Sequence, residues 1–452
     1  MSATEQQSSV RDSLTTETGG LADASLREAL GVIATGVVPA IVRGLFAPWR
    51  GAMKLLTRAD ADARAIAVLT AVRRRHGGQG VRLLRGRLIV LWGVDAIREV
   101  LDRSAELFAS DAGAKATGMS HFQPDALTLS RGPDWRDRRP FNEAVLASRD
   151  RVHPDGRRFV EVVADEVDRM PLGHVLEWRD WERLFDLVTL RVIFGDRARC
   201  DQRLTGLLET LMREGNRLVG LRPNDEYYEL YGELERRVRD PEPGSLLARI
   251  ADAPHGDRTR VVQQIPHWMF AMRDTLAANA YRALAAIVAD PAVERRVRED
   301  MIGADICDPR ALDGMRYLGG CMHEAMRLWP TTPLLAREVV HDVTLAGERV
   351  PAGTQILIVN AFNHRDPDHV EDGDRLVPER WRSDSKDYRF NHLSNGSQDC
   401  PGGPLVMLLG KAAIAQVLSR WTLRLEEPSL PAGGPMPAMI DFYTERFTAS
   451  RR

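Results

Sequence analysis

The chain has 452 residues, of which 44% are hydrophobic and 28% charged, and its formal net charge at pH 7 is −2. This balance is typical of an ordinary soluble globular protein and gives no reason to expect nucleic acid or an anionic membrane as a partner. The four cysteines form no C-x-x-C pair, which argues against a zinc site or a disulfide framework and favours a reducing compartment.

The N-terminal region begins with a polar segment rich in Ser, Thr and Gln, so we expect residues 1–25 to form a disordered tail. The start lacks the basic region of a signal peptide. The apolar run Ala29–Val42 contains Pro39 and is shorter than the roughly 20 residues that a membrane-spanning helix needs. A helix lying on a surface is one interpretation, but we favour a packed N-terminal helix. We therefore expect a cytoplasmic protein without stable membrane insertion.

The next part of the chain alternates between helical and strand patterns. Apolar spacing predicts helices over 60–76 and 94–105, separated by a β-hairpin formed by 81–84 and 87–93. Residues 106–134 are rich in Gly and Pro and are expected to form a long loop. Loops of that length inside a compact chain tend to be functional.

The remainder of the chain is predicted to be mainly helical. Helices dominate from residue 135 to about 300, and the longest uninterrupted one runs over 265–289. Further helices are predicted over 312–328 and 405–421. Short antiparallel strands are expected at 343–345, 348–350 and 355–359. The sequence therefore predicts a mainly α fold with a small antiparallel β region, organised as one domain over 26–452.

Cys400 lies in a glycine-rich stretch directly before an apolar helix. Gly396 and Gly402 on its two sides allow the backbone to fold tightly around one sulfur. Backbone amides can then point at that sulfur and stabilise a thiolate. A rigidly held anionic sulfur is what an axial haem ligand needs. Taken alone, the stretch favours the other interpretation, a turn that contains an incidental buried cysteine.

Two further positions combine an acid with a neighbouring group. Glu324 and Arg327 are three residues apart on an apolar helix and can form a buried pair, although most pairs at this spacing are exposed and contribute little. Arg380, some fifty residues later, is a candidate third member, because a buried charge left unpaired is strongly destabilising. Asp274 and Thr275 lie side by side in the long helix, where an acid beside a hydroxyl group can relay protons.

Together these features resemble the cytochrome P450 superfamily, the haem-thiolate enzymes, over roughly residues 55–452. The signature F-x-x-G-x-R-x-C-x-G falls on 393–402, where the cysteine and both glycines match, while Leu393 replaces the aromatic residue and Gln398 the arginine. The other family motifs fall in the same order on Trp135 and Arg139, on Ala271–Thr275 with Met272 in the place of a glycine, on Glu324 and Arg327, on His364–Pro367 and on Pro378–Arg380.

The resemblance implies a triangular prism of helices around haem b, with Cys400 as the axial thiolate ligand of the iron. In this family the cysteine ligand pushes electron density towards the iron and favours O–O cleavage. By the same resemblance, Trp135 and Arg139 would hold one haem propionate and Arg337 a second. Asp274 and Thr275 would deliver protons during oxygen activation.

Four residues depart from the family pattern or stand next to a departure. Gln398 replaces a cation that normally pairs with a propionate, and Leu393 replaces an aromatic side chain that shields the sulfur. Met272 adds bulk where glycine leaves room near the oxygen site. Arg273 is a candidate partner for a substrate carboxylate, and the alternative is a partner for a nearby acid.

The family pattern also indicates which stretches line the substrate pocket. These are Phe108–Thr128, Met212–Tyr228, Phe270–Thr275, Thr331–Leu335 and Met439–Tyr443. The individual candidates are Phe122, Leu127, Ala271, Met272, Arg273, Leu334, Leu335 and Phe442. Most of these side chains are apolar, so an apolar small molecule is the expected substrate.

The expected function is that of a monomeric monooxygenase inserting one oxygen atom from O2 into this molecule, in natural-product metabolism. Because the chain contains no flavin or nicotinamide motif, electrons would come from NAD(P)H through a separate ferredoxin and ferredoxin reductase. Two alternatives stay open. The changes at Gln398, Met272 and Arg273 leave room for a haem-thiolate peroxygenase, isomerase or lyase, and the weakened cysteine loop leaves room for a non-catalytic relative with weak haem affinity.

Overall fold

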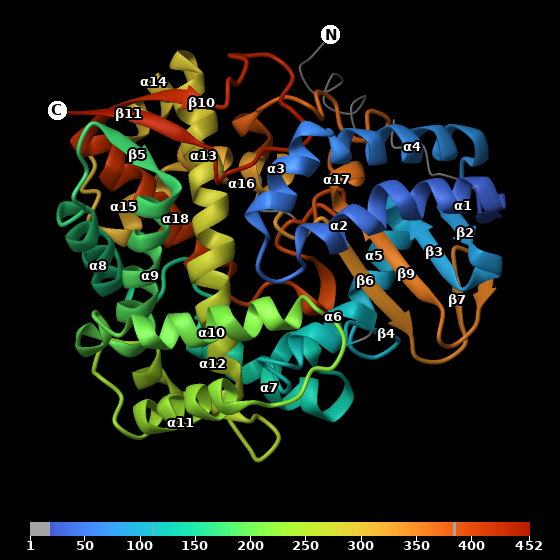
Figure 1. Cartoon of the computed structure of the whole chain (residues 1–452), viewed down its shortest axis with the longest axis horizontal. Coiled ribbons are helices and arrows are strands. Elements are labelled where there is room, and N and C mark those ends of the chain that lie inside the picture. Colours follow the sequence, from blue (N-terminus) through green and yellow to red (C-terminus); the bar gives the residue numbers. More distant parts are fainter. Residues whose placement is uncertain (1–18, 112, 383–385) are drawn as a thin grey trace, which may run out of the picture.

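Helices make up most of the molecule, and the largest sheet lies to one side of them (Figure 1). The computed structural model describes residues 19–111, 113–382 and 386–452. The α-helices are α1 (Leu26–Val32), α2 (Val38–Arg43), α3 (Arg50–Arg58), α4 (Ala61–His76), α5 (Val94–Asp102), α6 (Gly113–Met119), α7 (Gly132–Val145), α8 (Gly156–Asp168), α9 (Trp178–Phe194), α10 (Gln202–Gly215), α11 (Asp225–Arg239), α12 (Val261–Phe270), α13 (Ala277–Ala289), α14 (Pro291–Met301), α15 (Pro309–Gly314), α16 (Arg316–Leu328), α17 (Asn360–Asn363) and α18 (Gly403–Arg420).

Short helical turns and strands connect these helices. Two turns are π-helical, η1 (Ile33–Val37) and η6 (Ala271–Leu276). The 3-10 turns are η2 (Leu84–Gly86), η3 (Leu127–Leu129), η4 (Asp196–Ala198), η5 (Leu247–Asp252), η7 (Pro378–Trp381) and η8 (Gly396–Gln398). The strands are β1 (Leu21–Asp23), β2 (Gly80–Leu83), β3 (Leu88–Leu91), β4 (Phe108–Ala109), β5 (Val175–Glu177), β6 (Leu334–Val339), β7 (Val343–Leu345), β8 (Glu348–Val350), β9 (Gln355–Val359), β10 (Trp421–Glu427) and β11 (Arg446–Arg451).

The mainly helical character and the small β region predicted from the sequence are confirmed, and the predicted strands pair antiparallel, except that β9 also has a parallel neighbour. The largest sheet has the order β1-β2-β3-β9-β6-β4. Its β9 runs parallel to β3, with Leu88 opposite Gln355, and antiparallel to β6. The predicted partners β7 and β8 pair only with each other. Strand direction depends on which distant segment supplies the neighbour, and local residue patterns do not contain that information.

Two predicted irregular segments contain regular structure. Residues 21–23 of the expected tail form β1, which runs parallel to β2, and Ser25 then caps α1; residues 1–18 lie outside the described part. The expected loop 106–134 holds β4, α6 and η3, and α7 begins at its end. Both segments are short, so pairing and packing with distant elements outweigh their weak local signals.

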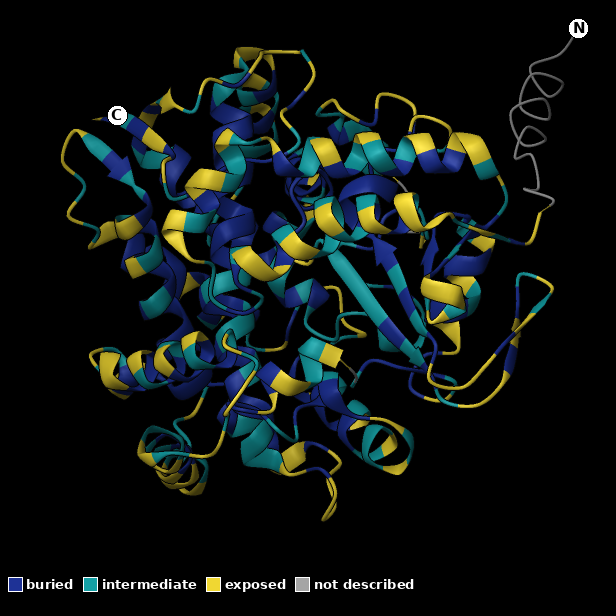
Figure 2. Cartoon of the chain, turned by 45° about the vertical axis from the view of Figure 1, so that its right-hand side comes forward, coloured by how far each residue is buried: buried dark blue, intermediate teal, exposed yellow. Residues whose placement is uncertain are grey.

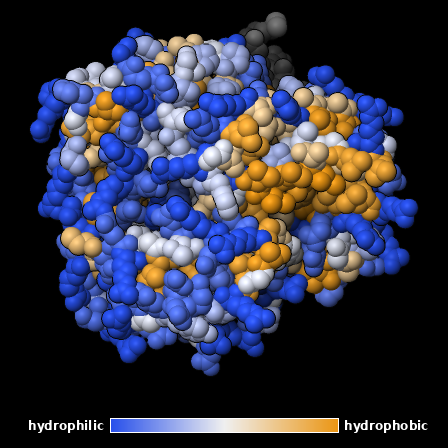
Figure 3. Space-filling model, viewed as in Figure 1, coloured by the Kyte–Doolittle hydropathy of each residue, from blue (hydrophilic) through white to orange (hydrophobic). Residues whose placement is uncertain are grey.

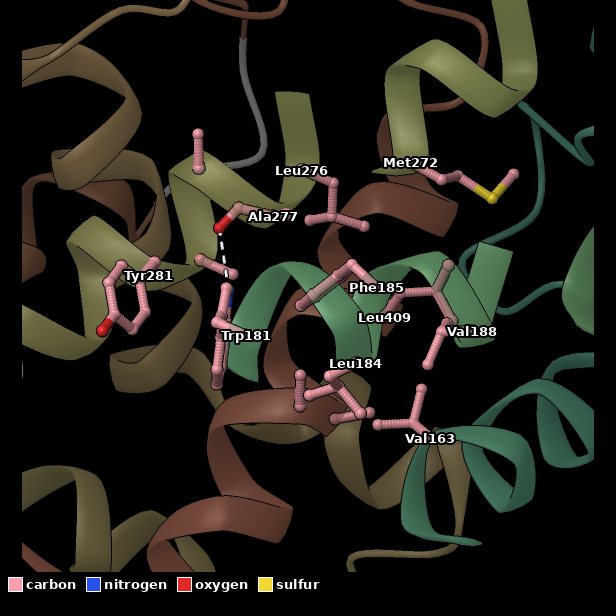
Figure 4. Close-up of a cluster of buried hydrophobic side chains, with 14 of the residues drawn as sticks. Val163, Trp181, Leu184, Phe185, Val188, Met272, Leu276, Ala277, Tyr281 and Leu409 are labelled. Atoms are coloured by element: carbon pink, nitrogen blue, oxygen red, sulfur yellow. Dashed lines mark hydrogen bonds between the residues drawn. The ribbon is translucent and has the colours of Figure 1, made fainter. Parts of the chain in front are cut away.

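A long helical rod formed by α12, η6 and α13 crosses the molecule (Figure 1). It covers the predicted helix 265–289, but η6 interrupts the regular α-helix in its middle. On one side it packs against α9, where the Trp181 indole donates to the Ala277 carbonyl across 2.9 Å (Figure 4). Residues 277–288 of α13 are all buried. The rod is therefore the central element of the main hydrophobic core.

The outer helices expose one face and bury the other (Figure 2). On α11, Leu230, Tyr231 and Leu234 are buried, at the spacing expected for one apolar edge on a charged helix. None of the helices in the described part of the chain combines the length and hydropathy needed to cross a bilayer.

Candidate haem and oxygen-activation site

The loop that carries Cys400 folds back on itself and leads directly into α18. The Cys400 amide donates to the Leu393 carbonyl at 2.9 Å, and the Gly403 amide donates to the Cys400 carbonyl at 3.2 Å. Gly396 has a φ of +69°, and a Cβ atom there would lie 2.2 Å from the Leu101 carbonyl oxygen. Only glycine satisfies both conditions. Burial raises the pKa of the Cys400 thiol, against the lowering effect of the Gly402 amide.

Hydrogen bonds hold this loop against α5 and β6. Ser397 Oγ donates to the Ser104 carbonyl at 2.8 Å, and Arg337 Nε donates to Ser104 Oγ at 2.9 Å. Ser104 thus joins the cysteine loop to the strand that carries Arg337. This connection places a predicted propionate ligand next to the predicted iron ligand.

Arg139 contacts the same loop from α7, through an acidic residue. Its Nη1 donates to the Asp399 carbonyl at 2.6 Å, its Nη2 pairs with Asp399 Oδ1 at 2.5 Å, and its Nε pairs with Glu143 Oε1 at 2.6 Å. Lys386 also pairs with Asp399, at 2.6 Å. Arg139 is therefore engaged with two carboxylates. Trp135, one turn earlier on α7, is half-buried.

Arg337 and Lys115 are two cations whose charges act on each other. Arg337 is 4% exposed, donates to Ser104 and to the Ala336 carbonyl, and forms no ion pair within the described residues. Burial lowers its pKa to about 10. Lys115 of α6 donates to the Thr128 carbonyl and hydroxyl oxygens at 2.9 and 2.8 Å. Burial, together with the charge of Arg337, lowers the pKa of Lys115 to about 7, with Asp111 opposing that shift.

The two departures in the cysteine signature occupy different surroundings. Leu393 is half-buried and packs against the main hydrophobic core, so its side chain takes part in packing beside the cysteine. The Gln398 side-chain oxygen is buried and has no hydrogen-bond partner in the described structure. An orphaned polar atom at this position is costly unless a further group satisfies it.

Arg273 forms the centre of a buried charge network on η6. It donates to Asp186 Oδ1 at 2.5 Å, to Glu209 Oε2 at 2.8 Å and to Asp274 Oδ1 at 2.9 Å. Its side chain is 5% exposed. Of the two interpretations of Arg273, partnership with nearby acids is the one that the structure displays.

The surroundings of Asp274 favour the protonated form of its carboxyl group. Burial raises its pKa to about 7, Arg273 opposes the shift, and the neighbouring carboxylates of Asp186, Glu209 and Glu182 add to it. Its Oδ2 atom is buried without a hydrogen-bond partner among the described residues. One carboxylate oxygen is thus anchored on a cation while the other remains available.

On the π-helical turn η6, the side chains of Thr275 and Met272 have different surroundings. Thr275 is half-buried, and its hydroxyl makes no hydrogen bond to any residue in the described ranges. Met272 is 4% exposed and belongs to the hydrophobic cluster with Phe185 and Val188 of α9 (Figure 4). The extra bulk of Met272 is therefore packed into the core. A π-helical turn often marks a functional position within a long helix.

The cysteine helix and the acid–alcohol turn are in contact. A Cβ atom at Gly410 of α18 would lie 3.2 Å from Leu276 of η6 and 2.3 Å from Met322 of α16. The absence of a side chain at this glycine lets α18 approach both helices closely. The loop of Cys400 and the turn of Asp274 are thereby held in a fixed relation.

Glu324 and Arg327 form a fully buried bidentate pair. Arg327 Nε and Nη2 donate to the two Glu324 oxygens at 2.7 and 2.8 Å, and both side chains are 0% exposed. The remaining donors of Arg327 reach the carbonyls of His364, Gly373 and Arg375. This pair therefore ties α16 to the segment that precedes the cysteine loop.

The predicted third member, Arg380, forms a longer ion pair with Glu324. Its Nε lies 3.5 Å from Glu324 Oε1 and makes no hydrogen bond. The Trp381 indole donates to that same carboxylate oxygen at 2.9 Å, and the Val377 amide donates to the other at 2.7 Å. Trp381 is thus a closer partner of Glu324 than Arg380 is.

The predicted pocket residues divide into two groups. Phe122 and Phe442 are buried in aromatic clusters, Phe122 against Phe46 and Phe270, and Phe442 against Trp178. Leu127 is also buried, with 8% exposure, whereas the half-buried candidates are Ala271, Leu334 and Leu335.

Sequence reasoning missed Lys115 and Trp381 as members of the site. A signal existed for Lys115, because only four of the 62 basic residues in the chain are lysines. A lysine inside a segment expected to be functional therefore stands out from the arginine background. No comparable signal marks Trp381, whose role depends on the approach of η7 to α16.

Comparisons with known proteins found sequence similarity to one family. The family model described as Cytochrome P450 matches residues 243–434, a range that contains Asp274, Glu324 and Cys400. The chain is 29% identical to cyclooctat-9-en-7-ol 5-monooxygenase of Streptomyces melanosporofaciens over 386 residues, covering 76% of this chain and 82% of that protein.

Matches to eukaryotic relatives are shorter. A probable cytochrome P450 of Drosophila melanogaster is 28% identical over 207 residues, covering 44% of this chain and 39% of that protein. A cytochrome P450 monooxygenase of Aspergillus fumigatus is 25% identical over 252 residues, covering 50% of this chain and 46% of that protein.

Replacing Glu324 by Gln is expected to destabilise the fold by about 3–5 kcal/mol, because the Arg327 charge would remain buried without its carboxylate. Urea unfolding monitored by circular dichroism measures the change. Glu99→Gln is the matched control, since Glu99 pairs with Arg103 on an accessible helix face, where the expected cost is about 0.3–0.5 kcal/mol. Equal losses for the two variants would contradict the structural role of the buried pair.

Proposed function

Because the chain belongs to the cytochrome P450 superfamily of haem-thiolate monooxygenases, we propose that it inserts one oxygen atom from O2 into an apolar small molecule. The observation that carries this proposal is the tight loop of Cys400, whose helix α18 contacts the turn bearing Asp274 and Thr275. Haem b is the cofactor of this superfamily, and when bound through the Cys400 sulfur it supplies the activation of O2.

The residues around the loop fit a haem with its anionic propionates. Arg337 lies next to the cysteine loop through Ser104, and its charge acts on Lys115; neither cation forms an ion pair in the described structure. An anionic group between them would replace the hydration that burial removes and would restore the charged form of Lys115. Arg139 is already neutralised by Asp399 and Glu143. We therefore assign the propionate contacts first to Arg337 and Lys115.

Asp274 and Thr275 are the residues proposed to handle protons. With a pKa of about 7, the Asp274 carboxyl exchanges a proton readily near neutral pH. Arg273 holds one carboxyl oxygen at 2.9 Å, which leaves the other free to give or take the proton. The Thr275 hydroxyl, without a partner in the described chain, is available to donate a hydrogen bond to the oxygen being activated.

The substrate and the electron source are further parts of the proposal. The half-buried Ala271, Leu334 and Leu335 favour an apolar ligand beside the cysteine loop. The name of the Streptomyces relative describes oxidation of cyclooctat-9-en-7-ol, which supports a natural-product substrate here. We propose that NAD(P)H supplies electrons through a separate ferredoxin and ferredoxin reductase. We further propose one domain over 26–452 and a cytoplasmic monomer.

The central test is the carbon monoxide spectrum of the reduced, haem-loaded protein. We expect the Soret shift of a thiolate-ligated haem in the wild type and its loss in Cys400→Ala, because alanine removes the sulfur that would hold the haem. Cys321→Ala is the control, since Cys321 is buried in α16 and is no part of the loop. A protein that purifies without haem, or a spectrum unchanged in Cys400→Ala, would overturn the assignment and favour a non-catalytic relative.

The role of Asp274 predicts a pH dependence of turnover with a reductase system. If turnover depends on the protonated carboxyl, its rate should be highest below pH 7. The rate should fall as the pH rises through about 7, because the carboxyl then loses that proton. Asp274→Asn is expected to lower turnover by about 10²–10⁴-fold and to remove this limb of the pH profile. Asp155→Asn, which affects an Arg249 pair elsewhere, is the control. Equal activity with peroxide alone, together with normal turnover in Asp274→Asn, would favour the peroxygenase alternative.

Lys115→Met is expected to weaken haem retention. A charge-assisted hydrogen bond contributes about 1.5–3 kcal/mol, so haem transfer to apomyoglobin should become roughly tenfold faster or more. Because the folded-state pKa of Lys115 lies below its ordinary value, the free energy of unfolding of the haem-free protein should rise with pH above about 7. That rise should disappear in Lys115→Met. The exposed Lys54→Met is the control, and identical haem transfer in both variants would contradict the assignment.

A further inference from the structure

The surface formed by the first helices is unusually apolar. Figure 3 shows a broad hydrophobic area over α1, η1 and α2 on the face viewed in Figure 1. Among the described residues, seven of the eleven exposed large hydrophobic side chains lie between positions 26 and 55. These seven, which we name the N-terminal apolar face, are Leu26, Leu30, Val38, Ile41, Val42, Trp49 and Leu55.

A second segment adds to this face. Asn216, in the loop between α10 and α11, accepts a hydrogen bond from the Phe46 amide at 3.0 Å and donates to the Ala47 carbonyl at 2.8 Å. Val219, three residues further along that loop, is 76% exposed. The loop is therefore fastened to the link between α2 and α3 and presents one more apolar side chain nearby.

Exposed basic residues accompany both segments. Arg27 lies three residues before Leu30 on α1, and Lys54 and Arg58 lie beside Leu55 on α3. Arg217 and Arg222 stand on either side of Val219 in the loop. These five cations are exposed and form no ion pair within the part of the chain that the structure describes. The exposed acids near the same two segments are three, namely Asp23, Asp60 and Asp225.

The composition of this face argues against two of its possible occupants. The chain's own residues 1–18 are mostly polar and offer few apolar side chains with which to cover it. A second copy docking the same face on itself would bring the two sets of unpaired cations together, which is unfavourable. An anionic lipid surface complements both features, because it accepts apolar side chains at its acyl boundary and attracts lysine and arginine at its headgroups.

We propose that the N-terminal apolar face docks on the surface of an anionic lipid bilayer. The helices would lie in the plane of the interface, with Trp49 at headgroup level and the basic residues against the lipid phosphates. The net charge of −2 does not oppose this arrangement, because the attraction depends on the local basic residues within about one Debye length. Docking of this kind is independent of the proposed oxidation chemistry.

Co-sedimentation of the haem-loaded full chain with vesicles tests the proposal. We expect binding to phosphatidylcholine vesicles that contain phosphatidylglycerol, weaker binding to pure phosphatidylcholine, and a decrease as salt is added. Ile41→Asp should lower the partition coefficient by about tenfold or more, since it removes an apolar anchor. Lys54→Gln and Arg58→Gln should each lower it by about fivefold.

Ile302→Asp is the matched control, because Ile302 is 79% exposed but follows α14, far from α1 in Figure 1. Its binding to the anionic vesicles should equal that of the wild type. Ile41 is exposed, so an unchanged carbon monoxide spectrum verifies that Ile41→Asp remains folded. The proposal is overturned if the anionic vesicles bind no protein or if Ile41→Asp binds as well as Ile302→Asp. It is also overturned if size-exclusion chromatography reveals a dimer that Ile41→Asp abolishes while vesicle binding is absent.

Discussion

The buried pair of Glu324 and Arg327 holds together the part of the molecule on which the site depends. The Arg327 guanidinium is shared between one carboxylate and three backbone carbonyls from the segment after β9. That segment leads into the loop of Cys400, so its position relative to α16 determines where the sulfur lies. A charge with no exposure to water tolerates few alternative arrangements, and this requirement makes the cysteine loop rigid.

The same principle operates in the charge network of η6, with a different outcome. Arg273 is nearly as buried as Arg327, but it faces three carboxylates instead of one. The excess of negative charge and the burial keep the Asp274 pKa near neutrality, so one acid remains able to exchange a proton. A fully neutralised pair stabilises the scaffold, whereas an incompletely neutralised cluster is suited to chemistry.

Arg337 and Lys115 show the opposite situation to the buried carboxylates, because these two cations form no ion pair within the described structure. The charge of Arg337, next to the cysteine loop, acts on Lys115, which lies on a helix within a segment expected to be irregular. If they hold the haem propionates as proposed, the loss of an arginine at Gln398 is offset by a lysine from another element. The N-terminal apolar face is a larger surface of the same kind. There, exposed apolar side chains occur together with cations that form no ion pair among the described residues.

Short stretches of the chain were sufficient to predict the mainly helical fold, the family resemblance, the tight loop around Cys400 and the local pairing of Glu324 with Arg327. These features depend on composition, on helical spacing and on glycines next to one sulfur, all of which are local properties. The folded molecule was needed to find that Arg139 is engaged with Asp399, that Trp381 replaces Arg380 as the nearer partner of Glu324, and that Met272 packs into the core. Each of these contacts joins elements that are distant in sequence, and their identity follows from how helices and strands pack, which no local pattern encodes.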